Sequence, residues 1–229
     1  MDAVIPQVVL TIFGIPITDT VVSTWVMMVL VIVIAILIRK FKPEAGEMIV
    51  ETILGLISSV MPENVNLLKF LPLLGALMIF LLFGNTFSVF PLMVSPTANI
   101  NTAFALSLVV FFAVHFFGVQ KKGFFGYLKS LATPIFMFPL EIVSQLSRTL
   151  ALTVRLFGNI ISTDLIVAIV FSLIPYIVPL VMTALGLLTG VLQAYIFTIL
   201  AALFIAAAVE VETTETERRA LKQELEQSS

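Results

Sequence analysis

Long apolar segments, separated by short polar ones, run through most of this chain. The first, Val21–Ile38, has about 18 residues, enough for a helix that crosses the ~30 Å hydrocarbon core of a bilayer. Pro43 follows it closely and stops a helix. Leu71–Phe90 and Thr102–Val119 are of similar length, and the turn-forming residues of Pro91–Asn101 separate them. The pattern therefore predicts three membrane helices in the first half of the chain.

Two later apolar segments are longer than a bilayer is thick. Phe136–Leu173 has about 38 residues, which as a helix extend roughly 57 Å. Such a helix must tilt steeply, lie partly along the membrane plane, or break. A short turn, Ile174-Pro175-Tyr176, leads to a second overlong run, Ile177–Ala208. The two runs predict an antiparallel helical hairpin.

The segment between the first two spans has a different pattern. Glu44, Glu47 and Glu51 recur at three- and four-residue spacing, and apolar residues follow the same spacing on another side. This is typical of an amphipathic helix with one acidic face, within residues 43–69. A position at the membrane surface or against a partner, and a solvated helical loop, both fit this pattern. After Glu210 the chain turns hydrophilic, and we expect a helical tail exposed to water.

These elements predict one all-α membrane domain over residues 1–229, with about five membrane helices and an amphipathic surface helix. Its parts are an outer N-terminus (1–20), a first span (21–38), the amphipathic segment (43–69), the second and third spans with their loops (71–129), the hairpin (136–209) and the charged tail (210–229).

The composition agrees with an integral membrane protein. Hydrophobic residues make up 60% of the chain and charged residues 11%, against about 45–50% and 25% in soluble domains. The basic residues are few and scattered, so nucleic-acid binding has no support. The chain has no cysteine, which excludes disulfides, and its single histidine, His115, is too little for a His-ligated metal site. We expect no cofactor.

The distribution of basic residues predicts the orientation of the chain. Segments 1–20, 91–101 and 174–178 contain no Lys or Arg. Cytoplasmic loops carry an excess of these residues, so we expect the C-terminus in the cytoplasm and the N-terminus outside. The basic residues on the predicted cytoplasmic side are Arg39, Lys40, Lys42, Lys69, Lys121, Lys122, Lys129, Arg218, Arg219 and Lys222.

Four charged residues interrupt the apolar sequence between Ser130 and Val209. Ionisable groups at membrane depth are costly, rare and usually functional. The first three are spaced by seven residues, so on a helix they form one stripe. The four are Glu141, Arg148, Arg155 and Asp164.

Arg155 is a permanent positive charge because arginine is not deprotonated in proteins. It would lower the pKa of a nearby carboxyl group and repel a mobile cation. Glu141 lies about 21 Å away along the helix and Asp164 about half a turn out of phase, so neither is placed to pair with it. We therefore infer that its carboxylate partner lies on another subunit. Asn159, at i+4, shares the face of Arg155, and Gln193 could approach that face across the hairpin.

Two polar surfaces lie on either side of Arg155. Glu141, Ser144 and Arg148 share one face of the helix by their spacing, whereas Asp164 faces elsewhere. This arrangement suits two aqueous paths separated by Arg155.

The run Arg155-Leu156-Phe157-Gly158-Asn159, with Glu141 upstream and Leu192–Phe197 downstream, closely resembles subunit a of F-type ATP synthases. Ser95–Asn101 and Lys121-Lys122-Gly123 also resemble that family, and the similarity covers roughly residues 65–210. The resemblance implies a membrane-plane hairpin in which Arg155 faces a c-ring carboxylate. It also implies roles for the polar residues: Asn159 and Gln193 as neighbours of Arg155, and Glu141 and Asp164 as half-channel carboxylates.

The resemblance further implies a component of an ATP synthase complex that has no catalytic site of its own. Its partners would be the c-ring oligomer, b-type peripheral stalk subunits, the F1 sector indirectly, and the lipid bilayer, in a bacterial plasma (inner) membrane. The sequence leaves open whether the ion is H⁺ or Na⁺, because much of that choice lies in the c subunit.

The chain departs from the family pattern at four positions. Asp164 stands where many members have Glu, and Gly186 where some bacterial relatives have a histidine. Arg148 replaces a common Lys, and Asn99 stands where an acidic residue is frequent.

Two other classes of membrane protein are alternatives to an ion-path stator subunit. A stand-alone secondary ion transporter predicts internal pseudo-symmetry and broken helices at matching positions, and the chain shows neither clearly. An intramembrane hydrolase needs a nucleophile with a base, a metal site or paired aspartates. One histidine, no cysteine and a single central aspartate argue against it.

Overall fold

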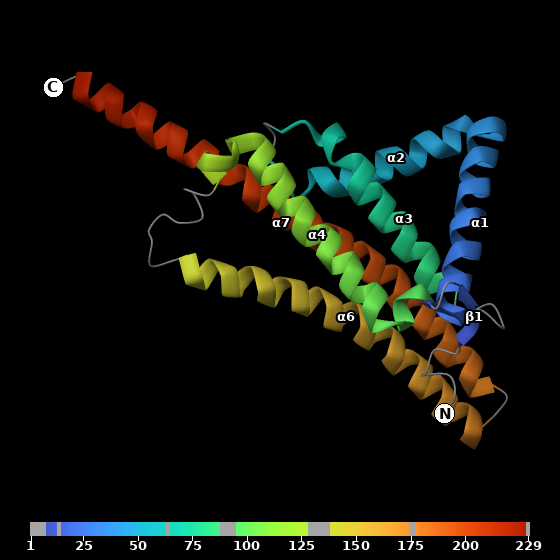
Figure 1. The fold of residues 1–229 in the computed structure, drawn as a ribbon. Coiled ribbons are helices and arrows are strands. Elements are labelled where there is room, and N and C mark those ends of the chain that lie inside the picture. The colour runs from blue at the N-terminus through green and yellow to red at the C-terminus, as the bar shows by residue number, and fades with distance from the viewer. Residues whose placement is uncertain are drawn as a thin grey trace.

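The computed structural model describes residues 8–12, 15–62, 65–87, 95–127, 138–174 and 177–227, and only the backbone of residues 8–10, 12, 15–17, 138, 177 and 210–227. The end of the predicted second span (88–90), the first four residues of the turn after it (91–94), Lys129, and the turn residues Pro175 and Tyr176 lie outside the described residues. The elements are β1 Val8–Ile12, β2 Ile15–Thr18, α1 Asp19–Phe41, α2 Pro43–Ser58, η1 Leu67–Lys69, α3 Leu71–Phe87, η2 Pro96–Ala98, α4 Ile100–Lys122, α6 Phe138–Leu173 and α7 Ile177–Gln227 (Figure 1).

Helices dominate the structure, as the hydrophobic pattern predicted. Four of them, α1, α4, α6 and α7, contain apolar stretches long enough to cross a membrane. The fifth apolar helix, α3, has 17 residues and extends about 25 Å, slightly less than a ~30 Å hydrocarbon core. The protein is therefore a multi-pass helical membrane protein with about five membrane helices.

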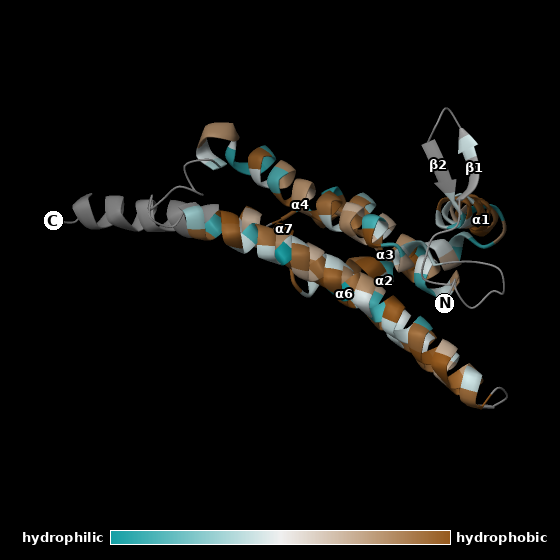
Figure 2. Ribbon diagram, turned by 60° about the horizontal axis from the view of Figure 1, so that its bottom comes forward, coloured by the Kyte–Doolittle hydropathy of each residue, from teal (hydrophilic) through white to brown (hydrophobic). Residues whose placement is uncertain are grey.

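The predicted hairpin is the longest feature of the fold. The 36 residues of α6 and the 51 residues of α7 extend about 54 Å and 77 Å. The two helices run antiparallel and meet near the α6–α7 turn, whereas the start of α6 stands apart from α7 (Figure 1). Hydrophobic residues recur along both helices (Figure 2). Helix α7 continues without interruption into residues 210–227, so the backbone of the tail is helical as predicted.

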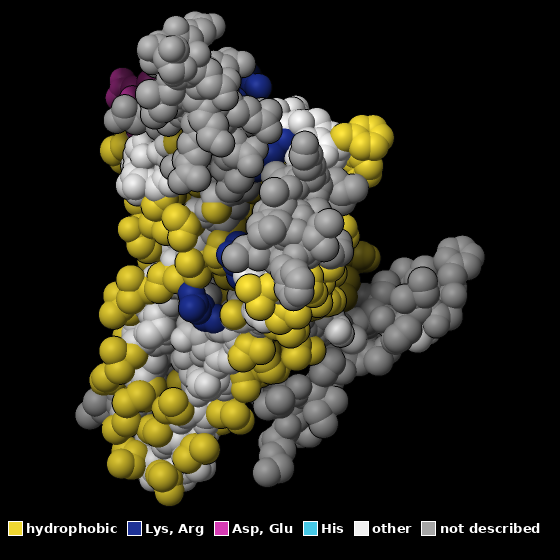
Figure 3. All heavy atoms as spheres, turned by 90° about the vertical axis from the view of Figure 1, so that its left-hand side faces the viewer, with side chains coloured by type: hydrophobic (Ala, Val, Ile, Leu, Met, Phe, Trp, Pro, Cys, Tyr) yellow, Lys and Arg dark blue, Asp and Glu magenta, His cyan; other side chains and the backbone are white. Residues whose placement is uncertain are grey.

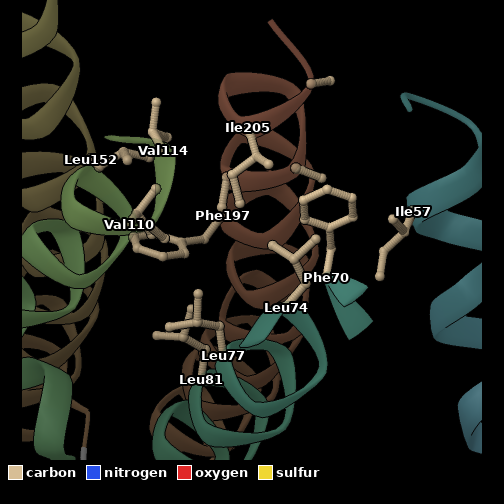
Figure 4. Packing of buried hydrophobic residues seen from close by; sticks show 14 of the residues in the cluster. Ile57, Phe70, Leu74, Leu77, Leu81, Val110, Val114, Leu152, Phe197 and Ile205 are labelled. Carbon is tan, nitrogen blue, oxygen red and sulfur yellow. The ribbon is translucent and has the colours of Figure 1, made fainter. Parts of the chain in front are cut away.

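α7 forms the centre of the buried core. Phe197 and Ile205 of α7 are fully buried, and they lie among side chains from α3, α4 and α6 (Figure 4). Leu81 on α3 and Val110 on α4 belong to the same buried cluster. By contrast, most α1 side chains, including Trp25, are exposed, as expected for a helix that contacts lipid.

The amphipathic segment forms a shorter helix than its sequence range allowed. Helix α2 ends at Ser58, because Pro62 cannot continue it, and η1 is a separate turn whose Asn66 side chain accepts a hydrogen bond from the Leu68 amide. All three glutamates of the predicted acidic face are exposed. Ile53 and Ile57, on the other side of α2, are buried, which confirms its amphipathic character.

The N-terminal segment contains a small sheet that the sequence pattern did not predict. β1 and β2 pair antiparallel, with Val8 opposite Thr18 and Ile12 opposite Ile15. Both strands are rich in β-branched residues, which favour strands. Their apolar character is continuous rather than alternating, so the usual pattern of a half-buried strand is missing.

Candidate functional site

The four charged residues between Ser130 and Val209 all lie on α6. No proline interrupts α6 between Leu140 and Leu173, and several of its hydroxyl side chains bond back to its own carbonyl groups. Thr149 Oγ1 donates to the Gln145 carbonyl, and Thr153 Oγ1 to the Thr149 carbonyl. Internal bonds of this kind satisfy polar groups where water is absent.

Arg155 lies on an exposed face of α6. Its neighbour Leu156 is fully buried in the core, so Arg155 points away from the packed side of the helix. Within the described part of the chain, no residue forms a hydrogen bond or an ion pair with Arg155. Leu150 and Val154 beside it are also exposed. In Figure 3, Lys and Arg side chains are set into a surface that is mainly hydrophobic.

Arg148 is turned toward α7, unlike Arg155. Its guanidinium carbon lies 5.2 Å from the centroid of the Phe204 ring, a distance suited to a cation–π interaction. Arg148 is half-buried. The predicted stripe of three charges is therefore divided, because one arginine packs on an aromatic ring and the other faces outward. The sequence pattern did not point to Phe204, since this contact depends on how α6 and α7 align.

Glu141 belongs to a small polar group near the start of α6. Gln145 Nε2 donates a hydrogen bond of 2.9 Å to Glu141 Oε1. Ser144 and Arg148 are half-buried like Glu141, as expected for residues that share a face. Burial raises the pKa of the Tyr127 hydroxyl above its ordinary value, and the negative charge of Glu141 raises it further. Tyr127 and Gln145 are therefore neighbours of this group that sequence reasoning missed.

Asn159 reaches across the hairpin to α7. Its Nδ2 atom donates to the carbonyl oxygen of Thr189 at 3.5 Å. Gln193 lies one turn further along α7, so it shares a face with Thr189. Only 5% of Gln193 is exposed, and its Nε2 atom has no hydrogen-bond partner among the described residues. The two amides lie close to the same helix crossing, although no direct hydrogen bond joins them in the described structure.

Asp164 is exposed, and no ion pair to it is formed within the residues that the structure covers. Beside it, Thr163 packs against Gly186 of α7: a Cβ atom added to Gly186 would lie 2.5 Å from Thr163 Cγ2. Real Cβ atoms do not approach other atoms so closely, so a histidine does not fit here without a shift. Gly186 thus serves close helix packing.

No group of His, Cys, Asp and Glu residues within the described ranges is arranged to hold a metal ion. Together, fold and site define a multi-pass membrane protein with fixed charges on a long membrane helix. A family model described as the ATP synthase A chain matches residues 21–206. The chain belongs to this family.

Several curated relatives match most of the chain. "ATP synthase subunit a 2" of Bradyrhizobium sp. (strain BTAi1) is 44% identical over 202 residues, which cover 84% of this chain and 89% of that protein. "ATP synthase subunit a" of Albidiferax ferrireducens is 42% identical, with 82% and 85% coverage. The Legionella pneumophila "ATP synthase subunit a" is 35% identical, with 91% and 94% coverage.

Proposed function

We propose that this chain is the ion-path stator subunit of a rotary F-type ATP synthase. It would supply two half-channels and the arginine that couples translocation of protons, or of sodium ions, to rotation of a c-ring. The observation that carries the proposal is Arg155: a permanent charge on an exposed, largely apolar helix face, without a partner in the described part of the chain. A charge so placed needs a carboxylate from another subunit.

The mechanism follows from electrostatics. An ion enters one half-channel and neutralises a carboxylate of the c-ring, which can then face lipid as the ring turns. When the site returns to Arg155, the guanidinium favours the ionised carboxylate. At 4 Å and an effective dielectric constant of 20 the attraction is about 4 kcal/mol. Arg155 therefore promotes release into the other half-channel and repels ions that would cross directly.

The two half-channels would lie on opposite sides of Arg155. Because α6 and α7 are antiparallel, a cytoplasmic C-terminus puts the start of α6 on the cytoplasmic side as well. The half-buried group of Glu141, Ser144 and Arg148 then belongs to the cytoplasmic path, and Asp164 to the outer path. Asn159 and Gln193 would lie at the level of Arg155, between the two paths.

The surroundings of the proposed subunit follow from its exposed surface. Leu146, Leu150 and Val154 form an exposed apolar stripe on α6 next to Arg155, which suits an apolar helix of the c-ring. Peripheral stalk subunits of the b type, lipid and, indirectly, the F1 sector would be the other partners. The nucleotide chemistry would take place in partner subunits and not in this chain. The membrane would be a bacterial inner membrane.

A cross-linking experiment tests the predicted c-ring contact. Because the chain has no cysteine, a Val154→Cys variant can be paired with a c subunit that carries a cysteine next to its carboxylate. Ile36→Cys is the matched control, since Ile36 is 59% exposed and Val154 64%, but α1 stands apart from α6 (Figure 1). We expect a disulfide between the two subunits with Val154→Cys only. Equal yields of this disulfide with the two variants would contradict the proposal. So would a complex that contains this chain but no c-ring.

A further inference from the structure

A buried polar cluster lies outside the charged residues of α6 and joins three parts of the fold. Asn85 on α3, Ser95 and Thr97 are all at most 2% exposed. Ser95 Oγ donates to the Gly84 carbonyl at 2.9 Å, and Thr97 Oγ1 donates to Asn85 Oδ1 at 2.8 Å. The two hydroxyl oxygens lie 2.8 Å apart. The segment before α4 thus holds the side-chain amide of Asn85 from one side.

The other end of that amide binds α7. Asn85 Nδ2 donates a hydrogen bond of 2.9 Å to the Gly190 carbonyl, across 105 residues of sequence. The helices are so close here that a Cβ atom on Gly190 would lie 2.9 Å from Asn85 Cβ. If α7 shifted by one residue, Thr189 or Val191 would bring a side chain to this point. The contact therefore fixes the register of α7 to a single residue. A shift by one residue would move the helix about 1.5 Å along its axis and turn it by about 100°.

The same crossing carries the polar neighbours of Arg155. The carbonyl groups of Thr189 and Gly190, successive residues of α7, accept hydrogen bonds from Asn159 on α6 and Asn85 on α3. Gln193 follows within one turn. Its Nε2 atom is buried and has no partner among the described residues, which is costly in a packed interior. Rotation of α7 about its axis would let this amide reach a hydrogen-bond partner. The hydrogen bonds from Asn85 and Asn159 to the α7 backbone oppose that rotation.

We propose that Asn85, held by Thr97, is a positioning residue for ion translocation: it fixes the register of α7 and so holds Gln193 at the level of Asn159 and Arg155. This inference rests on the function proposed above. Asn85 acts through α7 and does not itself touch the ion in this role.

Two matched pairs of variants test the inference in the assembled ATP synthase. Thr97→Val keeps the shape of the side chain but loses the hydrogen bond to Asn85, whereas Thr97→Ser keeps the hydroxyl. Gly190→Ala pushes α7 away from Asn85 and leaves every polar group in place. Its control is Gly55→Ala on α2, where an added Cβ meets nothing within 4 Å. The readout is the number of ions pumped per ATP hydrolysed in membrane vesicles with equal amounts of complex.

We expect Thr97→Val and Gly190→Ala to shift the balance between coupled and uncoupled turnovers, which this ratio reports, about fivefold toward the uncoupled ones, the effect of losing roughly one buried hydrogen bond. Thr97→Ser and Gly55→Ala should leave that balance within about twofold of wild type. An unchanged ratio in Thr97→Val, even with less complex, would overturn the inference. A loss in Thr97→Val without a loss in Gly190→Ala would also overturn it, because it would indicate a polar path through the cluster instead. Arg155→Ala in the same vesicles separates the two proposals: if it still pumps, the proposed function itself fails.

Discussion

Arg148 and Arg155 show how two identical side chains on one helix acquire different surroundings. Both lie on α6, seven residues apart. The guanidinium of Arg148 packs on Phe204, where the π-electrons of the ring offset part of its desolvation. Arg155 has an exposed apolar surface around it and no partner in the described ranges. The difference explains why Arg155, rather than Arg148, is the residue proposed to meet a carboxylate of the c-ring.

Gly186 gives a test at the scale of single atoms. In Gly186→Ala, the new methyl group would meet Thr163 Cγ2 at 2.5 Å, and we expect overpacking to destabilise the complex by about 1–3 kcal/mol. Thr163→Ser removes Cγ2 and keeps the hydroxyl, so the double variant should recover most of the lost thermal stability. The measurement is the melting temperature of the purified complex. A stable Gly186→Ala single variant would show that α6 and α7 are not closely packed here.

The candidate site could be predicted from sequence only in part. Charged residues in an apolar segment are a local signal, which is why Glu141, Arg155 and Asp164 stood out. Contacts between helices depend on their alignment, which composition and spacing do not determine. The cation–π contact with Phe204 and the hydrogen bond from Asn159 to Thr189 are therefore features that only the structure supplied.

At the scale of elements, apolar length predicted the helices, and local capping set their ends. Helix α4 begins at Ile100 because Asn99 caps it, accepting a hydrogen bond from the Asn101 amide. It ends where Gly123 adopts a φ of 72°, a conformation that glycine tolerates. Asn99 therefore has a structural role at this position, where an acidic residue is frequent in the family. The small N-terminal sheet was missed because neither of its strands alternates apolar with polar residues.

The packing of α7 gives a test of an element as a whole. Phe197 is 0% exposed and lies between α3 and α4, so Phe197→Ala should leave a cavity. In soluble cores such a change costs about 3–5 kcal/mol. In lipid the free energy of transferring the side chain out of water largely vanishes. We expect the cost of the cavity itself, about 1–2 kcal/mol, to remain. Denaturation in mixed micelles measures the loss. Phe171→Ala, at a position 58% exposed, should be close to neutral, and similar losses for both would contradict the packing.

At the scale of the whole molecule, the distribution of charge predicts the orientation. Single cysteines can be introduced at Asp2 and Ser229, because the chain has none of its own. A membrane-impermeant maleimide added to intact spheroplasts should label Asp2→Cys and leave Ser229→Cys unlabelled until the membrane is opened. The reverse result would invert the assignment of Glu141 and Asp164 to the two paths. It would leave the membership in the ATP synthase A chain family unaffected.

The central claim is that the fixed charge of Arg155 couples ion flow to rotation. The direct measurement is ATP synthesis by membrane vesicles under an imposed ion gradient, with wild type and Arg155→Ala compared at equal c-ring content. Arg39→Ala, which removes an arginine at the end of α1, is the control. We expect synthesis to fall below detection in Arg155→Ala while the complex still assembles, and to persist in Arg39→Ala. Substantial gradient-driven synthesis by Arg155→Ala would contradict the account.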